Sequence, residues 1–384
     1  MLIIQNATIY TCNEKRDVLP QGDILIQDGR ILEIGKTPEG LDARIFNASG
    51  LSLYPGFVDA HSHIGGESMN FEEQDINEMT APSTPDLQVL DVIDFSLPFY
   101  DYARKAGITS CCITPGSGNV ICGLACAVKT WGSECLKNPV AMKMAMGGNP
   151  KGVYGPRHER PMTRMGIAQI IRSELQKARE YLRDKASGKD IPYDAGLENL
   201  GLVLRREIPI KVHCEQFDML TVQRIAKEFE IEYTLEHAWG ASDYYDELMD
   251  PRLKGIIFGP IGVMMLPGEI GKVDIESLVE LDRRGKCCAI MTDGPILNPD
   301  LLVYQAGEVL RFGGDYLRVL QMLTLNPAKI LGVEKRVGSL EKGKDADLVL
   351  FRGKAVEDPR AKVAATLVNG TFVYEEEKKG VEKD

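Results

Sequence analysis

Apolar runs at both ends of the chain predict β-strands joined by tight turns. Residues 24–34 (ILIQDGRILEI) form two apolar runs on either side of an Asp-Gly pair, and residues 365–374 (ATLVNGTFVY) repeat this pattern around Asn-Gly. Both dipeptides are typical of two-residue hairpin turns, which need positive φ at both positions. Neither end has enough strands for a core of its own. We therefore expect the two ends to meet in one small β-domain.

The middle of the chain alternates short apolar segments with helical patterns. Eight apolar segments begin near residues 56, 108, 124, 140, 208, 232, 255 and 286, and helical spacing is clearest between 167 and 182. This alternation predicts a parallel sheet covered on both faces, and the length fits a (β/α)8 TIM barrel. We predict an α/β fold with a barrel domain over 55–335. A β-sandwich domain would be built from 1–54 plus 336–384.

Composition narrows the class of protein and its partners. The 384 residues are 44% hydrophobic and 26% charged, which is ordinary for a globular protein. We expect no membrane span, because no apolar run reaches about 18 residues, and we see no secretion signal. The net charge of −11 disfavours nucleic acid as a partner. An odd count of nine cysteines, set in apolar runs, favours reduced thiols and a cytoplasmic location.

Four of the five histidines lie at the ends of predicted strands. His61 and His63 end the apolar run 57–63 (FVDAHSH), while His213 and His237 follow the runs IKVH and YTLEH. Side chains two apart on a strand point the same way, so His61 and His63 can face the barrel axis and share one metal. Asp293 ends the eighth segment with a carboxylate. The C-terminal ends of barrel strands carry the active site in this fold.

Imidazole and carboxylate ligands without a thiolate favour zinc, with manganese, iron or nickel as alternatives. A catalytic zinc keeps one position open for water and lowers the pKa of that water to about 7. The pattern therefore predicts a site for one or two zinc ions or another divalent transition metal.

Three motifs, in this order, identify a family that the chain resembles. They are residues 53–63 (LYPGFVDAHSH), 326–332 (NPAKILG) and 338–349 (GSLEKGKDADLV). The chain resembles the amidohydrolase superfamily over essentially its full length, in the branch that contains imidazolonepropionases and Xaa-Pro dipeptidase-like enzymes. The resemblance implies metal-dependent hydrolysis on a (β/α)8 barrel with a small β-sandwich.

The resemblance also implies roles for individual residues. His61 and His63 would hold the more buried metal, and His213 and His237 would bind a second metal or complete a mononuclear site. Asp293 would bind metal and carry a proton from the attacking water to the leaving nitrogen, as a carboxylate beside a metal can do. We take Asp293 and His237 as the catalytic residues.

A two-metal member of the superfamily also needs a bridging anion, which many relatives supply as a lysine carboxylated by CO₂. Lys143 lies in the middle of the apolar segment 140–147 (VAMKMAMG), and burial there favours the neutral amine that reacts with CO₂. Lys129, in the segment 127–131, is the competing candidate. A mononuclear site without a bridge is the third possibility.

Candidates for substrate recognition lie mainly in one of two long connections, 64–98 and 147–206, which are typical of lids or binding loops. Arginine side chains suit carboxylate groups, although a solvated basic loop would look the same. We read His158, in the same loop, as a residue outside the ligand set. The candidate substrate-binding residues are Tyr154, Arg157, Arg160, Arg164 and, two positions after His237, Trp239.

We predict an amidohydrolase that uses metal-activated water to cleave a non-peptide C–N bond in a cyclic amide or N-acyl group of a small molecule. An Xaa-Pro-type dipeptidase would use the same residues. Ring deamination is disfavoured, because Gln216 stands where deaminases of this superfamily carry Glu, and Glu215 is one position early. A catalytically inactive scaffold is the remaining alternative. Homo-oligomers are common among such proteins, so we expect one here.

Overall fold

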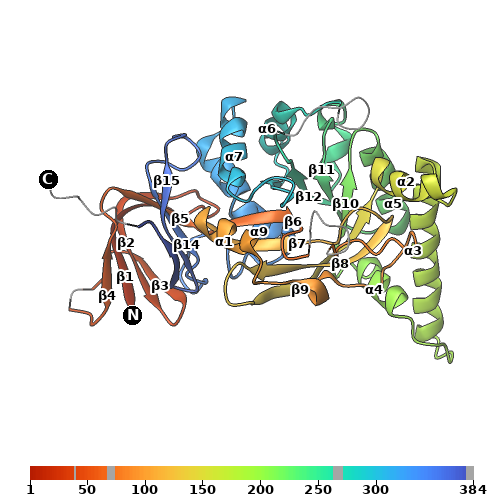
Figure 1. Ribbon diagram of the computed structural model, residues 1–384, viewed down its shortest axis with the longest axis horizontal. Coiled ribbons are helices and arrows are strands. Elements are labelled where there is room, and N and C mark those ends of the chain that lie inside the picture. The colour runs from red at the N-terminus through yellow and green to blue at the C-terminus, as the bar shows by residue number, and fades with distance from the viewer. Residues whose placement is uncertain (39, 67–73, 263–270, 378–384) are drawn as a thin grey trace.

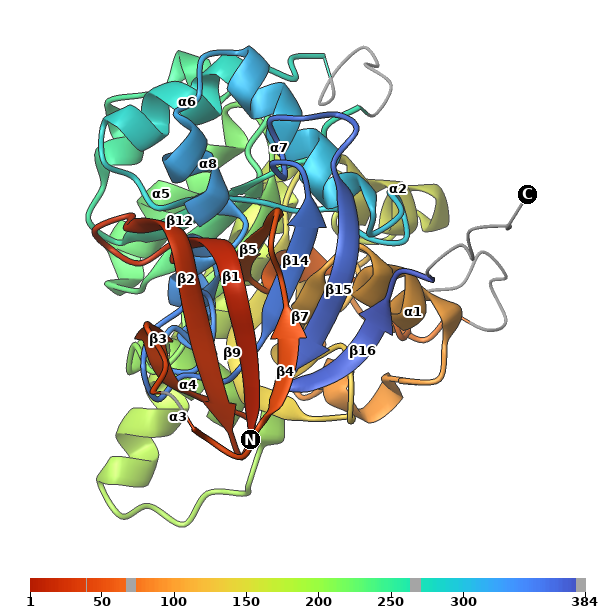
Figure 2. The ribbon, with the colours of Figure 1, turned by 90° about the vertical axis from the view of Figure 1, so that its left-hand side faces the viewer.

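Strands from both ends of the chain form one sheet. The computed structural model describes residues 1–38, 40–66, 74–262 and 271–377. Figure 2 shows the red strands β1, β2 and β4 beside the blue strands β14, β15 and β16. We call this the terminal sheet. Its strands are β1 (Leu2–Tyr10), β2 (Val18–Gln27), β3 (Arg30–Gly35), β4 (Arg44–Asn47), β5 (Leu51–Pro55), β14 (Leu348–Arg352), β15 (Lys362–Val368) and β16 (Thr371–Glu375).

The turns and the core of the terminal sheet agree with the sequence pattern. Asp28 and Gly29 have φ of 51° and 76°, and Asn369 and Gly370 have φ of 48° and 70°, as the predicted hairpin turns require. β5 and β14 pair antiparallel and join the two ends of the chain. Alternate strand residues fill a separate apolar cluster of this sheet. The division of the chain into two domains at the predicted boundaries stays a prediction.

The second sheet curls into a nearly closed barrel, and we call it the barrel sheet. Its strands follow one another in chain order. A bridge between Ser62 and Gly294 and a hydrogen bond from Asp293 N to the His61 carbonyl oxygen (3.2 Å) link its first strand to the segment after its last. The strands are β6 (Phe57–Ser62), β7 (Ile108–Ile113), β8 (Ile121–Lys129), β9 (Cys135–Ala145), β10 (Ile210–Cys214), β11 (Tyr233–His237), β12 (Leu253–Phe258) and β13 (Cys288–Ile290).

The prediction of a wholly parallel barrel is wrong for one strand. β8 runs antiparallel to both β7 and β9, whereas the other neighbouring pairs in the described part of the barrel sheet run parallel. The connections 114–120 and 130–134 are too short for the helical crossover that a parallel pair requires. The C-terminal end of β8 therefore lies at the side of the barrel where its neighbours β7 and β9 begin.

Helices cover the outside of the barrel sheet, and the long helix α3 lies at the end of the molecule opposite the terminal sheet (Figure 1). α3 contains the predicted stripe, with Ile167, Ile171 and Leu175 buried, and the Thr163 side chain caps its first turn by accepting from Gly166 N. The helices are α1 (Pro98–Lys105), α2 (Gly148–Tyr154), α3 (Arg164–Ala186), α4 (Ala195–Leu204), α5 (Asp218–Phe229), α6 (Ile275–Arg283), α7 (Leu301–Arg311), α8 (Tyr316–Met322) and α9 (Leu325–Leu331).

Two further findings bear on the predicted class. Within the ranges that the structure covers, we find no helix with the length and apolar character needed to cross a membrane. All nine cysteines are free thiols, and seven of them are buried. The long connection 147–206 contains α2, α3 and α4, while residues 67–73 of the connection 64–98 lie outside the described residues.

Candidate metal centre and active site

Three side chains converge at the point where the barrel closes. His61 and His63 come from the end of β6, and Asp293 follows β13. The two Nε2 atoms lie 3.3 Å apart, and each lies 3.2 Å from Asp293 Oδ1. These atoms form one compact set that could hold a metal ion. The i, i+2 spacing on the strand places both imidazoles on the same side of the sheet, as expected.

The histidine rings are oriented by their other nitrogen. A carbonyl oxygen can only accept, so Nδ1 of His63 and of His237 must carry the proton, and Nε2 keeps its lone pair. Ligating histidines in metalloproteins are oriented by contacts of this kind. The Nδ1 atoms lie 2.8 Å from Glu236 Oε2 for His61, 2.9 Å from the Thr114 carbonyl oxygen for His63, and 2.9 Å from the Gly259 carbonyl oxygen for His237.

This orientation bears directly on the fit of a cation. The Nδ1 atom of His61 faces the Glu236 carboxylate and that of His63 faces a carbonyl oxygen, so both carry their proton there, and two Nε2 lone pairs and a carboxylate oxygen face one another within 3.3 Å. Three acceptors at that separation repel one another unless a cation or a proton lies between them. The donor set, two imidazoles and one carboxylate, is one that zinc and similar divalent metals prefer. The residues therefore fit a divalent metal.

His213 and His237 extend the site across β10 and β11. Their ring centroids lie 4.2 Å apart, and the ring of His237 lies 5.6 Å from that of His61. His213 Nε2 is 3.1 Å from Glu215 Oε1. His237 and Asp293 both adopt left-handed backbone conformations, with φ of 66° and 55°. Such strained positions persist where the surrounding structure holds them, which is common at active sites.

The electrostatics set the protonation states that a metal needs. Burial and the positive charge of Lys143 lower the pKa of His61 to about 4, and burial beside His213 lowers the pKa of His237 to about 3. Burial opposes the ionisation of Asp293, but its contacts with His61 and His63 outweigh burial and hold its pKa well below the usual range. At neutral pH these histidines are neutral and Asp293 is ionised.

A buried pair of opposite charges, Glu236 and Lys211, contacts His61 at Nδ1, the ring nitrogen that points away from the proposed metal. Glu236 Oε2 contacts Lys211 Nζ at 2.7 Å and His61 Nδ1 at 2.8 Å, and its other oxygen accepts from the Thr234 hydroxyl at 2.8 Å. Burial opposes its ionisation, yet Lys211 and His61 hold the pKa of Glu236 at about 2. Lys211 also donates to the Ala60 carbonyl oxygen at 3.0 Å. Glu236 thus stays ionised and fixes the orientation of the His61 ring.

Lys143 is fully buried on β9, and its Nζ has no hydrogen-bond partner among the residues the structure describes. It lies opposite Lys211 in the register of β9 and β10. Burial lowers the pKa of its amine, which favours the neutral form. When the amine is protonated, its charge lowers the pKa of His61. A buried amine without a partner is costly, and carboxylation by CO₂ would replace it with an anion able to bind metal.

Lys129, the competing lysine, lies at the other side of the barrel because β8 is reversed. Its Nζ lies 2.7 Å from Asp345 Oδ2, 3.1 Å from Asp347 Oδ1 and 2.5 Å from Asn369 Oδ1. Three contacts match the three protons of an ammonium group. Lys129 therefore joins the barrel sheet to the terminal sheet, and Lys143 remains the candidate near the histidines.

Among the predicted substrate-binding residues, those of the 147–206 connection bind other segments of the chain or lie at the surface, and Trp239 lies beside the site. The hydroxyl of Tyr154 donates to Asn119 Oδ1 at 2.6 Å, and Arg157 donates to the Met79 carbonyl oxygen at 2.7 Å. Arg164 donates to Asp218 Oδ2 at 2.8 Å, while Arg160 and His158 line a shallow surface hollow near the start of α3. Trp239 lies beside a histidine of the site, with its ring centroid 5.3 Å from that of His237 and the two planes tilted by 60°.

Sequence reasoning missed three residues that build the site, Glu236, Lys211 and Thr114, and considered Glu215 only as standing one position early for a deaminase. A signal for two of them was present, because Lys211 and Glu236 are opposite charges inside apolar strands, and buried charges must pair. Glu215 stands two positions after His213, the same spacing as His61 and His63, so it points to the same side. Nothing in the sequence distinguishes the Thr114 carbonyl from any other.

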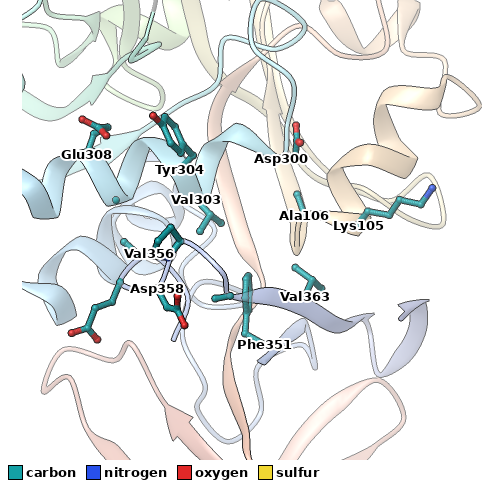
Figure 3. A pocket seen from close by; sticks show the side chains of 14 residues that line it. Lys105, Ala106, Asp300, Val303, Tyr304, Glu308, Phe351, Val356, Asp358 and Val363 are labelled. Carbon is teal, nitrogen blue, oxygen red and sulfur yellow. The ribbon is translucent and has the colours of Figure 1, made fainter. Parts of the chain in front are cut away.

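A separate cavity of about 540 Å³ lies between the end of α1, α7 and the segment after β14 (Figure 3). Ala106, Val303 and Val363 form apolar parts of its wall, and Asp300 and Glu308 carry carboxylates at its edge. None of the histidines, nor Asp293 or Lys143, lines this cavity. It is thus distinct from the candidate metal centre.

Comparison with known proteins agrees with this geometry. The profile described as "Amidohydrolase family" matches residues 256–373. A crystal structure of an amidohydrolase from Thermotoga maritima MSB8 is 34% identical, with a TM-score of 0.92 over 98% of this chain and 100% of that chain. Imidazolonepropionase of Colwellia psychrerythraea is 24% identical over 90% of this chain and 88% of its own length.

A third relative is longer than this chain. Amidohydrolase tasK of Hapsidospora irregularis is 28% identical over 373 residues, which cover 86% of this chain but only 38% of tasK. The fold and the convergent histidines and carboxylate define a barrel hydrolase with a candidate metal centre. The chain belongs to the amidohydrolase family, and the prediction of an amidohydrolase is confirmed.

Proposed function

We propose that this amidohydrolase depends on a divalent metal and cleaves a non-peptide C–N bond, in a cyclic amide or an N-acyl group of a small molecule. The observation that carries the proposal is the set of three acceptors, His61 Nε2, His63 Nε2 and Asp293 Oδ1, held within 3.3 Å of one another. The similarity to an imidazolonepropionase supports the choice of a non-peptide bond.

The metal would be held by His61, His63 and Asp293, with His213 and His237 completing one site or forming a second. We propose zinc, in one or two copies, with carboxylated Lys143 as the bridge in the two-metal form. When bound, such a metal polarises a carbonyl group and lowers the pKa of a water. The buried, unpartnered amine of Lys143 is the observation in favour of the bridge.

The protein's own groups then carry the proton and fix the geometry. Asp293 is ionised, so it can accept a proton from the attacking water and deliver it to the nitrogen that leaves. Glu236, held by Lys211, keeps the His61 ring in its orientation, and the Thr114 carbonyl does the same for His63. His237 would help to position the carbonyl that is attacked.

Two rivals use the same residues. An Xaa-Pro-type dipeptidase would share every proposed ligand, so only a substrate screen separates it. An aminohydrolase is the second candidate, because Glu215 lies 3.1 Å from His213 although it stands one position early in the sequence. Release of ammonia from purines or pyrimidines would favour that reading.

The remaining predictions on organisation are part of the proposal. We propose the β-sandwich domain at 1–54 plus 336–384, the barrel domain at 55–335, a cytoplasmic location and a homo-oligomer. The terminal sheet and its own apolar cluster support the first of these. Size-exclusion chromatography with light scattering would test the oligomeric state.

The deciding experiment is elemental analysis of the untreated enzyme, followed by chelation, reconstitution with zinc and a screen of cyclic amides and N-acyl dipeptides. We expect one or two metal ions per chain and hydrolysis that disappears on chelation and returns with zinc. A crystal structure of the same sample would show extra density on Lys143 in the two-metal form. An enzyme that neither contains metal nor takes up zinc would refute the proposal.

A further inference from the structure

The residues that follow β11 hold one indole in a fixed place beside the site. His237 and Ala238 both have left-handed backbones, with φ of 66° and 54°, and Trp239 comes next. The Trp239 carbonyl oxygen accepts from Gln216 N at 2.8 Å, and Gly240 N donates to Asp274 Oδ1 at 2.8 Å. Both hydrogen bonds are made by the single peptide group that joins Trp239 to Gly240, so they fix the main chain that carries the indole. Two successive strained residues are unusual outside functional sites.

The indole N–H of Trp239 lacks an acceptor. The side chain is only 5% exposed, yet Nε1 has no hydrogen-bond partner in the described part of the chain. An indole N–H can donate but not accept, so it needs an oxygen or a nitrogen lone pair. Buried donors in native proteins almost always have a partner. The ring that carries this unused donor lies 5.3 Å, centroid to centroid, from that of His237, and we take the missing acceptor to be a ligand group.

The surrounding charges indicate what kind of acceptor fits. Glu215 is buried, its Oε2 also has no partner within the described residues, and both Glu215 and Asp293 act electrostatically on His237. A neutral indole could not offset the desolvation of an anionic ligand group, and Glu215, outside the proposed metal ligands, would repel such a group when ionised. A neutral carbonyl oxygen avoids both penalties.

We propose that Trp239 determines specificity by donating its indole N–H to an uncharged carbonyl oxygen of the substrate, separate from the carbonyl that is attacked. The substrate class is then an amide that carries a second, neutral carbonyl group. This inference rests on the proposed function, because it takes the attacked carbonyl to lie at His61, His63 and Asp293.

Three ring compounds provide matched probes. Succinimide has two neutral carbonyls, 2-pyrrolidinone has one, and L-pyroglutamate adds a carboxylate to the single carbonyl. Only succinimide can place one carbonyl at the histidines and offer the other, uncharged, to Trp239. The chain also offers a matched control, because its other tryptophan, Trp131, is 48% exposed and lies under Arg104 in the turn after β8.

The first test is NMR of the metal-loaded enzyme labelled with ¹⁵N-tryptophan, which gives one indole signal for each of the two tryptophans. Trp131→Phe assigns the signal of Trp239. We expect succinimide to shift the Trp239 signal downfield, 2-pyrrolidinone to shift it much less, and neither to move Trp131. An unmoved Trp239 signal at saturating succinimide would overturn the proposal. A shift with L-pyroglutamate but not with succinimide would overturn the neutral class.

The second test is binding affinity. Trp239→Phe should lower the binding affinity for succinimide about fivefold to tenfold, which corresponds to the loss of one hydrogen bond. The affinity for 2-pyrrolidinone should not change. In the Trp131→Phe variant, Trp239 is the remaining tryptophan and can be replaced with benzothienylalanine, which lacks the N–H but keeps the shape of the ring. This second variant tests the hydrogen bond even if Trp239→Phe disturbs folding. Equal losses for both probes would show a packing role only.

Metal content and amide hydrolysis are measured on the same samples. If the enzyme holds metal and opens cyclic amides, but Trp239→Phe still binds succinimide more tightly than 2-pyrrolidinone to the same degree as wild type, the role of Trp239 is refuted and the proposed function stands. If the Trp239 signal responds to succinimide but no amide is cleaved, the proposed function fails instead.

Discussion

Two fully buried lysines in neighbouring strands differ in what surrounds their amines. Lys129, at the end of β8, has its amine within 3.1 Å of Asp345, Asp347 and Asn369. Lys143, on β9, has no hydrogen-bond partner within the described residues. Both would look alike in the sequence, as one charge at the centre or the end of an apolar run.

The difference shows how an arrangement of charges separates stability from chemistry. A satisfied buried ion pair holds two sheets together and is costly to break. An unsatisfied buried amine lowers stability in that form, and the fold tolerates it at the position where a reaction would use it.

The largest effect is expected at the proton-carrying carboxylate. Asp293→Asn keeps the shape but loses the base, so turnover per bound metal ion should fall by about 10²–10⁴-fold. Turnover and metal content are measured together, with Asp300→Asn, an exposed carboxylate at the separate cavity, as the control. Full turnover of Asp293→Asn with metal present would rule out the proton transfer.

Removing Lys129 should instead reduce stability. Lys129→Met leaves the buried Asp347 without the cation it contacts, while Asp345 keeps Arg30 and Arg336, and loss of one partner of a buried pair costs about 3–5 kcal/mol. Urea unfolding measures the change, and turnover of the folded enzyme should stay the same. Lys105→Met, which removes an ion pair that is half exposed on both sides, should cost less than about 1 kcal/mol. Equal costs for both variants would contradict the comparison.

Lys143→Met should give the opposite result. No hydrogen bond is lost, so the free energy of unfolding of the metal-free protein should stay the same or rise. Turnover should fall by at least about 10–100-fold, the loss that follows even when a partner outside the ligand set is removed from a metal site. Wild-type turnover with the same metal content would remove Lys143 from the proposed site.

The smallest expected effect is a pH dependence of the Lys129→Met defect. Burial opposes the ionisation of Asp345, but Lys129 and Arg336 hold its pKa below the usual range, so its contribution to stability is present above the unfolded pKa and lost as the pH falls. Burial raises the pKa of Asp347, which therefore takes up its proton first.

Without the Lys129 amine both carboxylates bind protons more readily. Lowering the pH therefore reduces the repulsion between the two buried carboxylates more in the variant than in the wild type. The difference in unfolding free energy between variant and wild type should narrow from pH 7 to pH 4.5. Urea unfolding at the two pH values measures it. A difference that stays constant or widens would mean that these carboxylates are not the cause.

Much of the fold follows from local patterns. The Asp28-Gly29 and Asn369-Gly370 turns, the buried stripe of α3 and the apolar strands all lie where the sequence predicts them. The direction of β8 could not be predicted from periodicity, because a fully buried strand reads the same in both directions. Only the short connections on each side of it carried that information.

The site follows the same division. Strand-end positions and the i, i+2 spacing were enough to gather the histidines and Asp293. The roles of Glu236 and Lys211 depend on the register between strands, in which His213 lies opposite Glu236. The partners of Arg157 and Arg164 depend on how loops pack, which no local pattern records.

The pairing of β5 with β14 has a consequence during synthesis of the chain. Roughly 290 residues separate these partners, so at about 5–20 residues per second a ribosome needs some 15–60 s to produce β14 after β5. During that time β5 has an unpaired edge of apolar residues, which is a template for aggregation. Yield of the folded protein should therefore depend on how fast the ribosome moves and on chaperones that cover this edge.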